Sequence, residues 1–544
     1  MWQQDYYPIA GSLAYSTMVA AIPLLLLFYM LGVKRKPSWI AGLTALGVAL
    51  ALSLTVVGMP APQAIASIIY GAAFGLFPIG WIVFASIMLY RVTVETGKFE
   101  IIKDSIGSLS DDRRLQALLI GFSFGAFIEG SAGFGTPVAV AAAMLTGLGF
   151  SPFFAACICL IANTAPVAFG SIGIPVVTLA GITGLPMDAL SSMTGRFCSL
   201  MSVIIPAYMV VVMAGFRKSL EVLPAIVACG VTFGLVQLFV SNTVGPELAD
   251  ILAALTSLAA MIVVMKVWRP ATIFRLEGDI PPTKSARKHT GGELLQAWSP
   301  YILLVVFVLA WGYGPVRAVL NTVSFPIEVP ALHNTITRMP PVTEGPSPYA
   351  AVFNMNWLAA AGTSCFLASF VAALLLGVSL PRFGKIFMAT QKQLAFPMLT
   401  IAAVLALAFL MNYAGMTTTL GLAFAATGSA FPFFSSMLGW LGVFLTGSDT
   451  SSNALFGNLQ VVTANALGLN PVLTASANAS GGVMGKMISL QSIAVAVAAT
   501  GMASSEEGRL FRFMLRHSLI LSVFMALITV VFAYGLPHLV PQVP

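Results

Sequence analysis

The feature that most constrains this chain is a succession of apolar runs about 20 residues long, each separated from the next by a short polar break. The runs cover residues 14–31, 38–57, 64–90, 197–215, 222–240, 251–265, 294–313, 357–380 and 519–534. With 58% apolar and only 8% charged residues, the composition excludes a soluble globular domain. The sequence therefore predicts an all-α polytopic membrane protein with about 12 transmembrane helices.

The basic residues predict how the chain is oriented. Most of the 26 Lys and Arg residues fall in alternate polar breaks, and the positive-inside rule makes that side cytoplasmic. Both termini are then expected outside, with an uncleaved first helix. The net charge of +7 is spread over many loops and forms no single patch, so we expect no nucleic acid partner.

The chain divides into two membrane halves with one unusual region in each. We expect a first half at 1–268, a cytoplasmic linker at 269–293 and a second half at 294–544, with an external loop at 314–349. Apolar arms too short to cross singly, joined by small polar residues, predict re-entrant hairpins at about 115–149 and 395–430. Similar Pro-Phe-Phe elements at 150–154 and 431–434 suggest two structural repeats with broken helices. Close packing of small residues is the alternative explanation for the glycines.

Glu129, Asp449 and Lys486 interrupt apolar segments, where a lone charge costs roughly 3 kcal/mol on insertion scales. Deep burial disfavours an ionised carboxylate, so Glu129 and Asp449 are candidates for proton coupling. Structural roles remain open: a salt bridge for Glu129, and support of a broken helix for Asp449. Lys486 is a candidate for capturing a carboxylate, but it could also pair with Asp449 or reach water from a segment end.

Polar side chains near these three charges are expected to complete a substrate site. They are Asn163, Thr164, Ser171, Asn412, Tyr413, Thr417, Ser448, Thr450 and Ser451. No phosphate-binding loop motif occurs, which disfavours ATP-driven transport and points to an ion gradient. No His falls inside a span, which argues against a His proton relay.

Other chemistries are less compatible with the sequence. Cys157 and Cys159 are close, but without neighbouring His or further Cys residues we expect packing and no metal site. We expect no cofactor and no enzymatic activity. Two buried acids, with Gly447-Ser-Asp449, leave an intramembrane aspartyl protease as a distant alternative, and a passive monocarboxylate or anion channel as a closer one.

Four long motifs carry a resemblance to a known family. They are Gly125-Ala-Phe-Ile-Glu-Gly-Ser-Ala-Gly-Phe-Gly135, Asn163-Thr-Ala-Pro-Val-Ala-Phe-Gly170, the run from Gly439 to Phe456 that contains Gly447-Ser-Asp449, and Gly481-Gly-Val-Met-Gly-Lys-Met-Ile-Ser489. In these motifs, and over essentially its whole length, the chain resembles the bacterial L-lactate permease family of lactate and glycolate proton symporters.

The resemblance implies proton-coupled uptake of L-lactate, and of related 2-hydroxy acids such as glycolate, across the bacterial inner membrane. It also implies two repeats with re-entrant hairpins. In the wider group of such transporters the repeats are inverted, whereas the basic residues place both expected hairpin starts on the cytoplasmic face. The relative orientation of the repeats is therefore left open.

Overall fold

The computed structural model describes residues 1–133, 135–276 and 289–542. Within these residues, 11 helical stretches are long and apolar enough to cross a membrane, or up to 12 if the bent pair Pro152–Ala162 and Val167–Thr183 forms one span. An all-α polytopic membrane protein with about 12 spans is thereby confirmed. Helices are the expected solution, because backbone polar groups in lipid must find their partners within the segment.

The first half is built from fourteen described helices, several of them extended by π-helical or 3-10 turns. They are α1 (Leu13–Phe28), α2 (Ser38–Thr55), α3 (Ala61–Phe74), α4 (Trp81–Glu95), α5 (Lys98–Gly107), α6 (Arg113–Gln116), α7 (Gly125–Ser131), α8 (Thr136–Gly147), α9 (Pro152–Ala162), α10 (Gly170–Thr183), α11 (Met187–Ala214), α12 (Phe216–Leu220), α13 (Leu223–Thr243) and α14 (Ala249–Val267). The shorter turns are η1 (Tyr29–Val33), η2 (Gly75–Gly80), η3 (Ala117–Phe124) and η4 (Val167–Phe169).

The second half carries the remaining described helices and most of the strands. The helices are α15 (Gly291–Gly312), α16 (Gly314–Asn321), α17 (Ala361–Leu375), α18 (Leu380–Tyr413), α19 (Met416–Phe424), α20 (Phe431–Thr446), α21 (Asp449–Ala466), α22 (Pro471–Lys486), α23 (Leu490–Thr500) and α24 (Glu507–Val530). The shorter turns are η5 (Ala425–Ala430), η6 (Ser504–Glu506), η7 (Val531–Gly535) and η8 (Pro537–Leu539). Of the expected linker at 269–293, residues 277–288 lie outside the described residues, and residues 291–293 already belong to α15.

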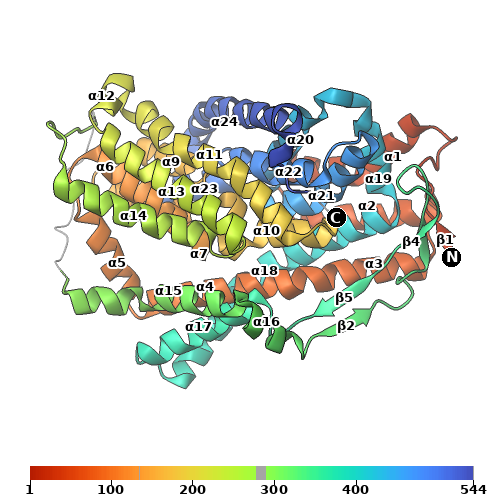
Figure 1. The fold of residues 1–544 in the computed structure, drawn as a ribbon, viewed down its shortest axis with the longest axis horizontal. Helices are drawn as coiled ribbons and strands as arrows, with labels where there is room; N and C mark the ends of the chain where they lie inside the picture. Colours follow the sequence, from red (N-terminus) through yellow and green to blue (C-terminus); the bar gives the residue numbers. More distant parts are fainter. Residues whose placement is uncertain (134, 277–288, 543–544) are drawn as a thin grey trace.

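One end of the bundle, the basic end, collects the Lys- and Arg-rich breaks. Lys98 donates to Gln296 at 2.7 Å, and Arg382 donates to the carbonyl of Glu95 at 2.6 Å. The first contact joins the starts of α5 and α15, and the second joins the start of α18 to the end of α4. Figure 1 shows α5, α6 and α12 together at this left-hand end of the molecule. Basic breaks that the sequence assigns to one side are therefore neighbours in space.

The opposite end, the sheet end, carries small strands that the sequence did not predict (Figure 1). The strands are β1 (Trp2–Gln3), β2 (Phe325–Glu328), β3 (Ile336–Arg338), β4 (Ser347–Pro348) and β5 (Val352–Met355). Strand β3 pairs in parallel with β1 and antiparallel with β4, whereas β2 pairs antiparallel with β5. The segment expected as an external loop is thus partly structured and tied to the N-terminus.

The first expected hairpin, at about 115–149, corresponds to a helical hairpin. Helix α6, η3 and α7 form one arm, α8 forms the other, and the turn between them includes Phe134, which lies outside the described residues. The open ends of the hairpin meet, because Nη1 of Arg113 donates to the carbonyl of Leu148 at 2.8 Å. A re-entrant course through the membrane stays a prediction.

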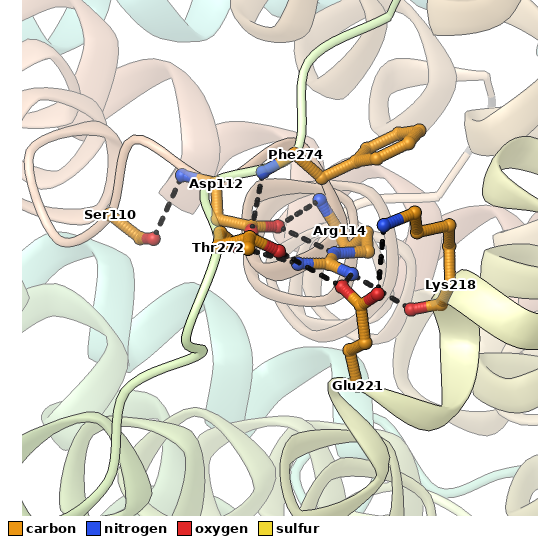
Figure 2. Close-up of polar contacts among 7 residues, drawn as sticks. All are labelled: Ser110, Asp112, Arg114, Lys218, Glu221, Thr272 and Phe274. Atoms are coloured by element: carbon orange, nitrogen blue, oxygen red, sulfur yellow. Dashed lines mark hydrogen bonds and ion pairs between the residues drawn. The ribbon is translucent and has the colours of Figure 1, made fainter.

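Arg114 anchors the base of this hairpin in a polar cluster at the basic end (Figure 2). Its fully buried guanidinium lies 2.7 Å from the carboxylate of Asp112 and 2.8 Å from that of Glu221. It also donates to the carbonyls of Lys218 and Thr272, at 2.8 and 3.0 Å. Hydrogen bonds from Lys218 and then from Arg114 lower the pKa of Glu221 to about 2. The cluster holds the hairpin to α12 and to the chain that follows α14.

The same order of parts recurs in the second half. In the first half, the hairpin is followed by α9 and α10, which are separated by a break at 163–169. In the second, α20 and α21 form a pair joined at 447–448, followed by α22 and α23, which are separated at 487–489. The first unit starts at the basic end, whereas the second starts next to α19, where Thr419 donates to the carbonyl of Tyr6 near β1. The two units therefore begin at opposite ends.

Residues 395–430, expected as the second hairpin, comprise three parts in the structure. Residues 395–413 belong to the single long helix α18, a turn follows at Ala414 and Gly415, and α19 and η5 complete the stretch. Helix α18 packs against α2, α3, α4 and α21, so it forms a wall beside the second unit.

Candidate functional site

Glu129, Asp449 and Lys486 line one cavity of about 270 Å³, although they come from distant parts of the chain. Glu129 lies on α7, Asp449 is the first residue of α21 and Lys486 is the last residue of α22. Each of the three side chains is at least nine-tenths buried. Four hydroxyl residues predicted to bind substrate also line the cavity: Ser171, Ser448, Thr450 and Ser451.

Lys486 is held by the end of a neighbouring helix. Its Nζ donates a 2.7 Å hydrogen bond to the carbonyl of Gly447, which ends α20. Gly447 has a φ of 72°, a left-handed conformation that glycine adopts without strain. The carbonyls at a helix C-terminus carry partial negative charge, so they favour an ammonium there. An ammonium has three donors, and this contact uses one of them.

Asp449 begins α21 with one carboxylate oxygen unsatisfied. Its Oδ2 accepts a 3.4 Å hydrogen bond from Asn453, one turn along the same helix. Its Oδ1 is buried and has no hydrogen-bond partner among the described residues. A Cβ built on Gly482 would lie 2.4 Å from this Oδ1, so the glycine leaves the space that the carboxylate occupies. The backbone amides at the start of α21 point toward the same region and favour negative charge.

Glu129 is surrounded by glycines. A Cβ on Gly170 would lie 2.6 Å from its Oε1, and one on Gly133 would lie 3.4 Å away. Its Oε2 is buried without a partner in the described part of the chain. The amide of Asn163 lies near this carboxyl group, yet neither of its polar atoms makes a hydrogen bond of normal geometry. Buried polar atoms without partners are uncommon, and together they indicate a place for water, a proton or a ligand.

An unwound segment of α10 forms the wall between these groups. Ser171, Ile172 and Gly173 have φ values of 46°, 61° and 74°, a left-handed run inside an otherwise helical stretch. Non-glycine residues in this conformation are strained and persist only where their surroundings hold them. Here Ser171 donates to the carbonyl of Ala132 at 3.0 Å, and Asn453 donates to that of Pro175 at 3.1 Å. The break is thus fixed by the turn of the first hairpin and by α21.

The other predicted substrate residues do not line this cavity. Thr164 donates to the carbonyl of Ile161 at 2.6 Å, in the break before α10. Asn412 accepts from Asn458 at 3.3 Å, and the hydroxyl of Tyr413 donates to the carbonyl of Ala350 at 2.9 Å. Thr417 is buried in the first turn of α19. These last three lie toward the sheet end, so their part in substrate binding stays a prediction.

Two residues near the site were missed by sequence reasoning. Asp250 is buried in the first turn of α14, and its Oδ2 has no partner among the described residues. The apolar run predicted from the sequence begins at Ile251. Asp250 was therefore assigned to the preceding loop and was not considered a buried acid. Gln491, in the first turn of α23, lines the cavity close to Gly447. A neutral amide beside an apolar run gives little sequence signal.

A second cavity, of about 770 Å³, adjoins the first. Lining residues that belong to both cavities are Ser38, Thr446, Gly447 and Gln491. The larger cavity is also lined by the exposed residues Arg35 and Lys36 and by Glu507, which precedes the basic turn of α24. In the described part of the chain, the larger cavity therefore leads from the basic end to the site.

Comparison with known proteins gives a consistent result over the whole chain. The family model described as L-lactate permease matches residues 16–536. An L-lactate permease of Bacillus subtilis is 48% identical, with 97% of this chain and 98% of the relative covered. An L-lactate permease of Escherichia coli K12 is 43% identical, with 99% and 100% covered. The glycolate permease GlcA of the same strain is 43% identical, with 98% of each chain covered.

Proposed function

The chain belongs to the L-lactate permease family, and from this premise we propose that it carries L-lactate and related 2-hydroxy monocarboxylates, such as glycolate, together with a proton. The observation that carries the proposal is the meeting of Lys486, Glu129 and Asp449 at one buried cavity. The membrane is the bacterial inner membrane, in which the protein is a multi-pass transporter.

Lys486 is the proposed ligand of the substrate carboxylate. One of its donors is engaged by Gly447, and the remaining donors are available for an anion in the cavity. The first turn of α21 supplies backbone amides and the hydroxyl groups of Ser448 and Thr450 nearby. A small acid needs these two features together, a cation for its carboxylate and short polar groups for its hydroxyl.

The charge balance of the site supports coupling to a proton. With all three side chains ionised, Glu129 and Asp449 outweigh Lys486 by one negative charge. An anionic substrate would add a second negative charge to a buried site, which is costly in a low-dielectric environment. Protonation of one carboxylate removes that cost, so substrate binding and proton binding favour each other through linkage.

The position of the larger cavity supports a membrane orientation for the chain and a conformation that is open on one side. We assign the basic end to the cytoplasm by the positive-inside rule, with both termini outside. The cavity, which adjoins the larger one lined by Arg35 and Lys36, is then open toward the cytoplasm. The two hairpin units start at opposite ends, which favours inverted repeats and a site between their breaks.

Proteoliposomes test the proposal. Counterflow of labelled L-lactate measures binding and transport without net driving force, and an imposed pH gradient measures accumulation against the substrate gradient. We expect both for the wild-type protein, and loss of accumulation for Glu129→Gln or Asp449→Asn. If both variants keep full proton-driven accumulation, the proton assignment is wrong. A passive channel would never accumulate substrate, and cleavage of a helical peptide would instead support a protease.

A further inference from the structure

Asp250 is a buried acid that the proposed mechanism has not used. Its side chain is 1% exposed in the first turn of α14. Oδ1 accepts a 2.8 Å hydrogen bond from Nε2 of Gln237 on α13, whose own Oε1 accepts from Ser202 at 2.8 Å. Oδ2 has no hydrogen-bond partner among the described residues, although it is fully enclosed. One oxygen of this carboxyl group is thus held by a hydrogen bond, and the other has no partner among the described residues.

The side chain of Asp250 lies beside the hairpin that carries Glu129. A Cβ built on Gly130, the residue after Glu129, would lie 3.1 Å from the Cβ of Asp250. The two carboxyl groups are close enough to interact electrostatically. Each presents one buried oxygen without a described partner. Ionising both acids at once in such a site is costly, so one proton shared between them is the favoured arrangement.

A third acid extends this pair toward the sheet end. Glu247 precedes Asp250 by three residues and is half-buried in the loop before α14. Arg317 on α16 and Asp188 at the start of α11 are its charged neighbours, and burial raises the pKa of Glu247. On the opposite side, Glu129 lines the cavity that adjoins the basic end. Glu247 is therefore a further partly buried acid, on the loop that leads into the helix of Asp250.

The surroundings of Asp250 suit a proton better than a metal ion. No group of three or more His, Cys, Asp and Glu residues in the described ranges could hold a metal. Gln237 offers Asp250 an N–H donor, whereas a cation needs oxygen ligands. Among the described residues, the titratable groups near Asp250 are Glu129 on α7 and the buried thiol of Cys198 on α11.

Resting on the proposed symport, we propose that Asp250 exchanges the coupled proton with Glu129 and connects it through Glu247 to the sheet end. The O–H bond of protonated Asp250 breaks as an O–H bond forms on Glu129, and the negative charge moves to Asp250. Asp250 then regains a proton from Glu247, whose O–H bond breaks, and Glu247 regains one from water at the sheet end. Lys486 and Asp449 remain with the substrate, so proton delivery and substrate binding use different residues on either side of Glu129.

The test compares proton-driven uptake with counterflow in the same proteoliposome preparation. Asp250→Asn keeps an oxygen that can accept from Gln237, so the link between α13 and α14 is preserved. We expect the ratio of uphill L-lactate accumulation to counterflow to fall at least about tenfold, in the range of lost proton transfer. Asp111→Asn, the same substitution at an exposed position of the basic end, is the matched control and should keep the wild-type ratio.

The outcomes separate this inference from the proposed function. If wild-type protein shows no lactate counterflow, the proposed function itself fails. If the wild type is proton-driven and Asp250→Asn keeps the wild-type ratio, the relay is overturned while the symport stands. If Asp250→Asn does not fold, Glu247→Gln is the deciding variant: a severalfold lower ratio supports the relay, and an unchanged ratio overturns it. Accumulation driven by Na⁺ in place of a pH gradient would also overturn the relay.

Discussion

Lys486 donates a 2.7 Å hydrogen bond to the carbonyl of Gly447, and this contact joins the end of α22 to the end of α20. The ammonium is thereby fixed at the cavity that Asp449 also lines. Of the roles that the sequence left open for Lys486, a side chain reaching out to bulk water is the least compatible with its 9% exposure. A positioned cation whose remaining donors have no partner among the described residues can bind an anionic group without moving far.

Replacing Lys486 with Met tests this arrangement. The substitution removes the ammonium, leaves the carbonyl of Gly447 without its donor and leaves two acids without a counter-charge. Loss of a charged hydrogen bond is worth about 1.5–3 kcal/mol, so we expect KM for L-lactate counterflow to rise roughly tenfold or more. Lys486→Arg keeps the charge and should retain part of the affinity. Equal KM values for the Met variant and the wild type would exclude Lys486 as the substrate ligand.

Gly482 supplies the space in which the carboxylate of Asp449 sits. Gly482→Ala would bring a Cβ to 2.4 Å from Oδ1 of Asp449 and 2.8 Å from a methyl of Val443. We expect overpacking of about 1–3 kcal/mol and a marked loss of transport, because α22 or Asp449 must move. Gly384→Ala, in α18 with no atom near the added methyl, is the matched control and should be neutral or slightly stabilising. Thermal unfolding in detergent and counterflow measure both effects.

The sequence predicted the fold class, and it singled out the three charges that line one cavity, for a simple physical reason. Apolar runs of spanning length and charges embedded in them are visible without any tertiary information. A charge within a membrane span needs polar surroundings, and broken helices provide such surroundings. Glu129, Asp449 and Lys486 therefore line the same cavity. The same logic found Ser171 and the Ser448 to Ser451 stretch.

Element boundaries were harder to predict, because a short hairpin arm and part of a long helix have the same composition. Residues 395–413 read as a hairpin arm but continue α18, whereas Pro152 and Pro432 both lie in the first turn of a helix, α9 and α20. Proline is favoured at the first turn of any helix, so a helix start is enough to explain the matching Pro-Phe-Phe elements. Asp250 was missed because only tertiary packing brings α14 against the first hairpin.

Acid should weaken the cluster at the base of the first hairpin. The pKa of Glu221 is lowered from 4.5 to about 2 by Lys218 and Arg114. Since the folded pKa lies below the unfolded one, the contribution of Glu221 to stability is fully present above about pH 4.5 and is lost as the pH falls toward 2. Unfolding temperatures in detergent should therefore differ between the wild type and Glu221→Gln at pH 7, and converge near pH 2. Glu328→Gln, an exposed acid at the sheet end, should behave like the wild type at both pH values.

Asn453 connects three helices that surround the cavity. Its amide donates to the carbonyl of Pro175 on α10 at 3.1 Å, and its carbonyl accepts from Asn478 on α22 at 2.9 Å. Asn453→Ala removes both contacts and also the donor to Asp449, which leaves buried polar groups unsatisfied at a cost of about 1–3 kcal/mol. We expect lower thermal stability together with a higher KM, because the unwound segment of α10 loses its tie to α21.

The control for this prediction lies on the same helix. Asn465→Ala changes an exposed amide near the end of α21 and should alter neither stability nor KM appreciably. If Asn453→Ala lowers the unfolding temperature but keeps the wild-type KM, the network stabilises the fold without shaping the site. If both variants behave alike, the contacts of Asn453 contribute little, and the break in α10 must be held by Ser171 and the turn of the first hairpin.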